Sequence, residues 1–122
     1  MAKRLGNVYW ANSQKIDKTD NKQRRQYAVV KDTGKTVGVS KIRGYNNNNL
    51  NDKRLYELDI KKYPLTKRSG VDYKVYNRRS DNKPLRLEDK QVFDSTPTFK
   101  LSSHDTHKAI QHTKNWQKKG RK

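Results

Sequence analysis

A hairpin signal in the first third of the chain constrains the fold more than any other feature. Two strand-forming segments, residues 26–31 and 36–43, flank a four-residue turn at 32–35. Gly34 can take the positive φ that such turns require. The first arm contains the near-continuous apolar run 27–30, which is typical of a strand buried in the centre of a sheet. We therefore expect an antiparallel hairpin at the heart of the fold.

The other strand signals are shorter. In the second arm of the hairpin the apolar and polar residues stop alternating after Val39, which predicts a bulge near Gly38 or Ser40. Further predicted strands are 7–10, an edge strand at 55–60, 71–76, and a last strand or turn at 85–87. Short strands at close spacing favour a small, strongly curved antiparallel sheet or barrel.

Two polar segments predict loops. Residues 12–24 contain almost no apolar residue except Ile16, and we expect them to form a long mobile loop. Four consecutive asparagines at 46–49 predict an exposed loop tip. In the first predicted strand, Tyr9 and Trp10 should point to opposite sides of the sheet. One of these rings is then expected in the core, and the other can offer a stacking platform.

One helix is expected near the end of the sequence. Ser102 and Ser103, followed by Asp105, form a helix-start signal with a hydroxyl cap and an acid in the first turn. The helix should run to about Lys118 and end near Gly120. Its apolar face is narrow, so we expect it to pack weakly at the edge of the sheet.

The composition fits one domain with a thin core. Apolar residues make up 30% of the 122 residues and charged residues 34%, which leaves little material for a core. We predict a single, mainly β domain over 1–122, with basic tails at 1–5 and 119–122 and one C-terminal α-helix. The chain has no cysteine, and no apolar stretch approaches membrane-spanning length. We therefore expect a cytoplasmic protein that makes no membrane contact.

Charge points to the partner. The 30 Lys and Arg residues outnumber the 12 Asp and Glu residues and give a formal net charge of +18. Several basic residues also lie beside tyrosines, as at 61–63 and 73–79. Positive charge for phosphates and flat rings for bases are what a single-stranded nucleic acid needs from a protein. Nucleic acid is therefore the leading expected partner, and a surface tuned only for solubility is the alternative.

Four segments, in order along the chain, resemble the MazF/PemK family of toxin ribonucleases. Residues 6–10, 25–30, 36–43 and 57–63 are similar to the family segments G-D-V-Y-W, R-P-V-L-V-I, T-V-I-V-A-P-I-T and V-E-I-D. The resemblance implies a compact SH3-like barrel, usually dimeric, that cuts single-stranded RNA without a metal. A toxin of this family also implies a small acidic antitoxin as a protein partner.

The resemblance also implies site residues. In this chemistry the ribose 2′-hydroxyl attacks the adjacent phosphate, and the protein positions the RNA, moves protons and stabilises charge. Arg25 stands at the motif arginine of the family and is expected to stabilise the transition state. The family's hydroxyl position falls on Arg43, so Ser40 or a histidine is the expected proton-handling group. The residues expected to hold the nucleic acid are Arg24, Lys41, Arg43, Arg78 and Arg79.

Other interpretations stay open at these residues. The three histidines of the predicted helix, His104, His107 and His112, can act as general acids or bases or simply lie on a polar helix face. His104 and His107 share a helix face, but two histidines with no cysteine and no clear third ligand fall short of a zinc site, and no metal or cofactor is predicted. The 78–79 turn is either a second phosphate clamp or an ordinary solvated turn. Besides an endoribonuclease, the fold can serve as a non-catalytic nucleic-acid-binding module or as a module that binds an acidic protein.

Overall fold

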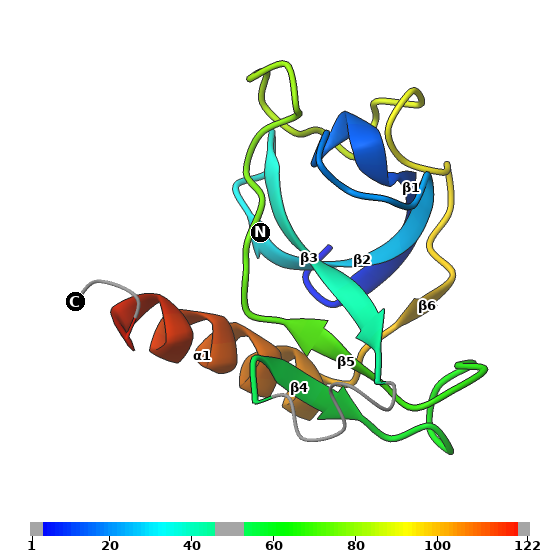
Figure 1. The fold of residues 1–122 in the computed structure, drawn as a ribbon, viewed down its shortest axis with the longest axis vertical. Coiled ribbons are helices and arrows are strands. Elements are labelled where there is room, and N and C mark those ends of the chain that lie inside the picture. Colours follow the sequence, from blue (N-terminus) through cyan, green and yellow to red (C-terminus); the bar gives the residue numbers. More distant parts are fainter. Residues whose placement is uncertain (1–3, 46–52, 120–122) are drawn as a thin grey trace.

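The computed structural model describes residues 4–45 and 53–119. Six strands form one antiparallel sheet in the order β4-β5-β3-β2-β1-β6. The sheet curls into a half-barrel, with α1 beside β4 (Figure 1). The elements are β1 (Asn7–Asn12), η1 (Ser13–Lys15), β2 (Arg24–Asp32), β3 (Val37–Gly44), β4 (Leu55–Leu58), β5 (Ser69–Asp72), β6 (Phe99–Lys100) and α1 (Ser103–Lys119). The predicted fold class, a mainly β domain with a small curved antiparallel sheet and one C-terminal helix, is confirmed.

The β2–β3 hairpin forms as the sequence predicts. Gly34 has a φ of +91°, and its backbone N–H donates to Asp32 Oδ1 at 2.9 Å. A second bond across the turn runs from the backbone N–H of Thr33 to the carbonyl oxygen of Thr36 at 3.0 Å. Because only glycine adopts such a φ without strain, the residue that signalled the turn also fixes its geometry.

The predicted bulge lies in the other arm of the hairpin. Strand pairing shifts register between Val29 and Lys31, so the extra residue is Val30 in β2, and Gly38 faces it across the ladder. The chain packs closely here, because a Cβ atom on Gly38 would lie 2.7 Å from Asn77 Oδ1. The glycine therefore marked the place of the irregularity, and the register shift assigns the extra residue to β2.

The sheet buries apolar side chains on both faces, because successive residues of β2 point in opposite directions. The first core lies on the concave side under the loops: Tyr9, Ala11, Ile16, Tyr27, Val29, Val37, Val39, Leu85, Leu87, Val92 and Phe93. The second core lies between the sheet and α1: Val8, Ala28, Ile42, Leu58, Tyr63, Val71, Leu101 and Ala109. The buried stretch of β2 contributes to both cores, and this explains its continuous apolar run.

Two predicted strands change their ends. β1 extends beyond residue 10 to Asn12. β4 is an edge strand as expected, but it ends at Leu58 rather than at residue 60. Asp59 turns the chain there, since its carboxylate accepts the backbone N–H of Lys61 at 2.9 Å. A side chain that competes for backbone hydrogen bonds thus ends the strand.

The later strands differ more from prediction. β5 covers Ser69–Asp72 instead of 71–76, and Tyr76 returns to the sheet through a single bridge to Val39. Residues 85–87 form no strand, and their two leucines fill the first core instead. The two-residue strand β6 pairs with β1 and was not predicted, because so short a segment carries no periodic signal.

The segments outside the sheet are also more ordered than expected. Instead of forming a mobile loop, the chain between β1 and β2 folds onto the half-barrel, with Ser13, Ile16 and Asp20 all buried. At the N-terminal end, residues 4 and 5 are not a free tail, because the Arg4 guanidinium pairs with Asp32 at 2.8 Å. The asparagine loop tip at 46–49 and the rest of the predicted tails, 1–3 and 120–122, lie outside the described residues.

The helix begins where the cap signal places it and is anchored by polar contacts. The Ser102 hydroxyl accepts the backbone N–H of Asp105 at 3.1 Å. The buried Asp105 carboxylate accepts hydroxyl hydrogen bonds from Tyr56 at 2.7 Å and from Tyr63. Burial raises the pKa of Asp105, but these bonds outweigh it and hold the pKa below its ordinary value. With Ala109 fully buried in the second core, α1 is attached more firmly than the predicted weak edge packing.

Candidate nucleic-acid interface

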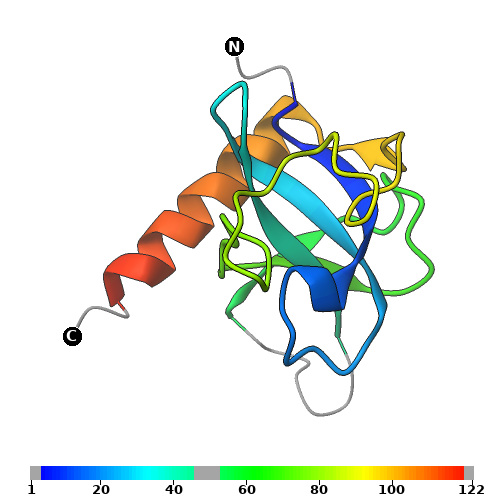
Figure 2. The ribbon, with the colours of Figure 1, turned by 90° about the horizontal axis from the view of Figure 1, so that it is seen from above.

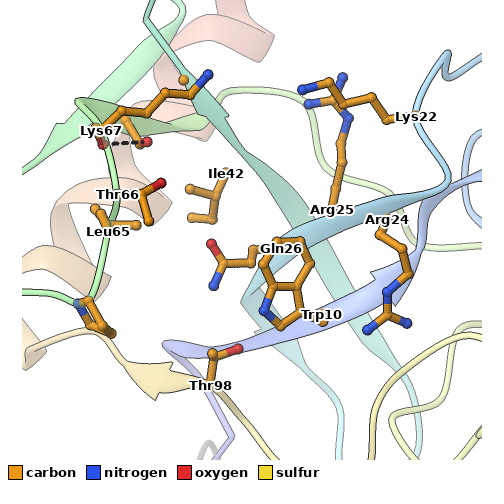
Figure 3. Close-up of a pocket in the computed structure, with 13 residues that line it drawn as sticks. Trp10, Lys22, Arg24, Arg25, Gln26, Ile42, Leu65, Thr66, Lys67 and Thr98 are labelled. Atoms are coloured by element: carbon orange, nitrogen blue, oxygen red, sulfur yellow. Dashed lines mark hydrogen bonds between the residues drawn. The ribbon is translucent and has the colours of Figure 1, made fainter.

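A cleft of about 260 Å³ opens between the adjoining parts of β1 and β2 and the segment that precedes β5 (Figure 3). We name it the Trp10 cleft. It is lined by Trp10, Lys22, Arg24, Arg25, Gln26, Ile42, Gly44, Pro64, Leu65, Thr66, Lys67, Ser69 and Thr98. Of these described residues four are cationic, and none is a carboxylate or an imidazole. The cleft is therefore positively charged and polar, with one large ring.

The alternation of β1 places that ring in the cleft. Tyr9 is buried in the first core, whereas Trp10 is 39% exposed. This confirms that the two rings point to opposite sides of the sheet. The Arg24 guanidinium lies 6.0 Å from the centre of the Trp10 ring. Two hydrogen bonds to Asp94, at 2.9 and 3.1 Å, hold that guanidinium. A flat ring beside a fixed guanidinium is a surface on which a nucleic-acid base can stack.

Arg25, the next residue of β2, also lines the cleft, and its side chain points away from Trp10 toward Lys22 (Figure 3). Its Nε donates to Asp20 Oδ2 at 2.7 Å, and its side chain is 18% exposed. Within residues 4–45 and 53–119, neither terminal nitrogen of this guanidinium donates to a protein acceptor. The carboxylate thus holds the arginine by one edge, and the two terminal nitrogens remain available to pair with a phosphate.

Asp20 is the centre of a buried polar network under the cleft. Besides Arg25, its Oδ2 accepts a hydrogen bond from the Ser13 hydroxyl and lies 3.2 Å from the Lys41 ammonium. Burial raises the pKa of Asp20, but the hydrogen bonds from Arg25 and Ser13 outweigh it and keep the pKa well below its ordinary value. Asp20 therefore stays ionised, and it fixes a cation at the cleft rather than a proton.

Two lysines complete the cationic lining. In the described part of the chain, neither Lys22 nor Lys67 forms an ion pair. The stem of Lys67 crosses directly over Gly44, where an added Cβ atom would lie 2.3 Å from Lys67 Cε. A residue larger than glycine would push this lysine away, so the close approach places Lys67 beside the cleft.

The structure brings only part of the predicted site together. Arg24 and Arg25 line the Trp10 cleft. Lys41 lies beneath it, with its ammonium 2.9 Å from Asp17, and Arg43 pairs with Asp72 at 2.9 Å. Ser40 is fully buried, and its hydroxyl donates to the carbonyl oxygen of residue 74 at 2.8 Å. A hydroxyl in that position has no access to an RNA strand.

The two arginines of the 78–79 turn are separate from the cleft. Arg79 is held between Asp81 at 3.0 Å and Asp89 at 2.7 Å, with only 14% of its side chain exposed. It therefore stabilises the loop rather than clamping a phosphate. Arg78 donates to the carbonyl oxygen of Asn82 at 3.1 Å and is exposed.

The histidines lie on α1, away from the cleft lining. His104 and His107 are exposed, and a ring nitrogen of His112 lies 2.8 Å from the carbonyl oxygen of Arg54. Among the residues that the structure describes, no group of three His, Cys, Asp or Glu side chains could hold a metal ion. The candidate site therefore consists of cations, hydroxyls, an amide and a tryptophan, together with the apolar side chains of Ile42, Pro64 and Leu65.

Sequence reasoning missed Lys22, Lys67 and Asp20. Lys22 and Asp20 lie in the segment that composition described as a mobile loop, and Lys67 comes from a segment with no strand or helix signal. Asp20 is separated from Arg25 by only five residues, and an acid that close to a motif arginine was the one usable signal.

No protein-family model matches this sequence, and a search of the curated proteins finds no similar chain. The resemblance to MazF/PemK toxins therefore rests on the four sequence segments alone. Within the described ranges, no helix has the length and apolar character needed to cross a membrane.

Proposed function

We propose that this protein binds single-stranded RNA in the Trp10 cleft. The observation that carries the proposal is that an exposed tryptophan and four cations line one cleft, whose described lining has no carboxylate. The ring supplies stacking for a base, and the cations pair with the phosphates on either side of it. The net charge of +18 supports the same partner, since it speeds association with a polyanion.

The polar lining favours an unpaired strand over a duplex. Gln26, Thr66 and Thr98 present an amide and two hydroxyls beside Trp10 (Figure 3). These groups can both donate and accept hydrogen bonds, as the exposed edge of an unpaired base requires. In a duplex that edge is already paired and the base faces are stacked, so neither contact would form.

RNA cleavage is the second candidate function, and Arg25 favours it. Its two terminal nitrogens have no acceptor among the described residues while Asp20 holds Nε, an arrangement suited to the charge that builds on a phosphate when a 2′-hydroxyl attacks it. This is the metal-free chemistry that the MazF/PemK resemblance implies. The same resemblance carries with it a toxin role in the cytoplasm, a homodimer and an acidic antitoxin, all of which we include in the proposal.

Binding can be tested with a fluorescein-labelled single-stranded RNA and the variants Trp10→Ala and Arg25→Lys. We expect both variants to bind more weakly while keeping the wild-type circular dichroism spectrum. Lys35→Ala is the matched control, since Lys35 is an exposed cation in the hairpin turn outside the cleft. Equal affinity in all four proteins would contradict binding in the Trp10 cleft.

Cleavage needs a separate measurement. Incubation of a long single-stranded RNA with the protein in EDTA should give fragments that end in a 2′,3′-cyclic phosphate. Arg25→Lys should lose most of this activity, because lysine keeps the charge but not the planar fork. If the RNA is bound but stays intact, the proposed ribonuclease activity is rejected and the proposed binding function is kept.

A further inference from the structure

A second groove lies on a different part of the molecule, between α1, the β2–β3 hairpin and the segment after β5. Figure 2 shows α1 passing beside the end of the hairpin. Two hollows, of about 520 and 310 Å³, meet at Lys31 and Asn77, which line both. We name the combined feature the α1 groove. It shares no described lining residue with the Trp10 cleft.

The larger part of the α1 groove has an aliphatic floor made by Leu5, Val30, Val75 and Ile110. Val30 is the bulged residue of β2, and it belongs to neither core, as is true of Val75 and Ile110. Leu5, Val75 and Ile110 are only partly buried. The groove therefore presents aliphatic surface that the described part of the fold leaves open to solvent, and such surface is a common basis for binding another chain.

The rim of the α1 groove is cationic. Lys31 and Lys114 are exposed and form no ion pair among the described residues, and Arg78 lies at the far end. The one carboxylate that lines the groove, Asp32, is neutralised by Arg4, whose Nη2 and Nε donate to it at 2.8 and 3.2 Å. The charge available to a ligand is thus positive, around an apolar floor.

We propose that the α1 groove binds an acidic segment of a partner protein, with aliphatic side chains on the floor and carboxylates against the rim. Charge complementarity selects an anion, and the floor decides its class. The described lining contains no aromatic ring, so a nucleic-acid base finds no ring to stack on among those residues. Leucine, isoleucine or valine side chains beside aspartate or glutamate match both properties.

The groove can be tested on the whole protein with a fluorescein-labelled peptide in which leucine and glutamate alternate. We expect saturable binding that weakens about tenfold in Lys31→Glu and again in Lys114→Glu, each reversal placing like charges together. A floor variant, Ile110→Ser, should weaken binding without changing the salt dependence. Lys22→Glu, a charge reversal in the Trp10 cleft, is the matched control. It should bind the peptide nearly as tightly as wild type, with only the small loss of affinity that a lower net charge causes.

Two further measurements separate this proposal from the RNA-binding function and from simple attraction between opposite charges. A peptide with serine in place of leucine should bind far more weakly, and unlabelled single-stranded RNA should not displace the leucine–glutamate peptide. Equal binding of the serine peptide, displacement by RNA, or an equal loss in Lys22→Glu would each overturn the proposal. The test does not depend on whether the Trp10 cleft binds or cuts RNA.

Discussion

The Trp10 cleft and the α1 groove carry the same sign of charge but differ in their floors. The cleft has an exposed tryptophan and two arginines among polar and apolar side chains. The groove instead has four aliphatic residues and two lysines that form no ion pair among the described residues. In each, a buried carboxylate lies beside the cations, Asp20 at the cleft and Asp32 at the groove. The comparison teaches that net charge selects an anionic partner, while the floor beneath the charge selects its chemical class.

The largest expected difference between the two regions concerns their buried carboxylates. Asp20→Ala would leave the mostly buried Arg25 cation without its carboxylate and Lys41 with Asp17 alone, and we expect a loss of about 3 kcal/mol in the free energy of unfolding. Asp32→Ala should cost less, about 1–2 kcal/mol, because Arg4 is more exposed and keeps Glu88.

Urea unfolding followed by circular dichroism would measure both losses. Asp94→Ala serves as the control, since the exposed Arg24–Asp94 pair should contribute less than about 1 kcal/mol. A smaller loss for Asp20→Ala than for Asp32→Ala would show that the cations under the cleft do not depend on the carboxylate.

A matched pair of floor substitutions should separate the two surfaces. Trp10→Ala should weaken RNA binding by about 1–3 kcal/mol, the usual value of a base stacked on an aromatic ring. Ile110→Ala, in the α1 groove, should leave RNA affinity unchanged. Fluorescence anisotropy with one labelled RNA measures both affinities. An equal loss of affinity in the two variants would contradict the assignment of RNA to the Trp10 cleft alone.

Acid should reduce the contribution of the Arg4–Asp32 ion pair, beside the groove, to the free energy of unfolding within a defined range of pH. The Arg4 guanidinium lowers the pKa of Asp32 from 3.8 to about 2. The unfolded chain therefore binds a proton at higher pH than the folded one, so this stabilisation is complete above pH 4 and is lost as the pH falls toward 2. Asp32→Asn should flatten the dependence of unfolding free energy on pH in that range, by about 1–2 kcal/mol, and an unchanged slope would show that the pair is not formed in solution.

The smallest predicted effect is in the salt dependence of RNA binding. Removing one phosphate contact from a single-strand complex lowers the slope of log affinity against log salt by about 0.7. Lys67→Gln, in the cleft, should show this reduction, whereas Lys114→Gln, in the groove, should keep the wild-type slope. A reduced slope in Lys114→Gln would place RNA on both surfaces.

The parts of the fold that the sequence predicted are those with local causes. The hairpin follows from Gly34 and the apolar run before it, and the helix start follows from Ser102 and Asp105, all within a few residues of the structure that they determine. The displaced β5 and the unpredicted β6 depend instead on pairing with strands far along the chain. Short segments whose partners are remote give no periodic signal of their own.

The candidate site was predictable in the same uneven way. Arg24, Arg25 and Trp10 lie on strands, so their alternation could be read, and they meet in one cleft. Ser40 lies on a strand too, but the covering chain near residue 74 buries its hydroxyl, and that covering depends on tertiary packing. Lys22 and Lys67 come from irregular segments whose positions only the folded chain defines.

The burial of β2 on both faces has a consequence for how this protein can change over generations. Inserting or deleting one residue in that strand would exchange the side chains of the two cores at once, so such events should be eliminated rather than tolerated. Insertions and deletions are then confined to strand ends and connecting segments, where Arg24, Lys22 and Lys67 lie. Descendants of this chain would therefore keep one scaffold and diversify mainly in what it binds.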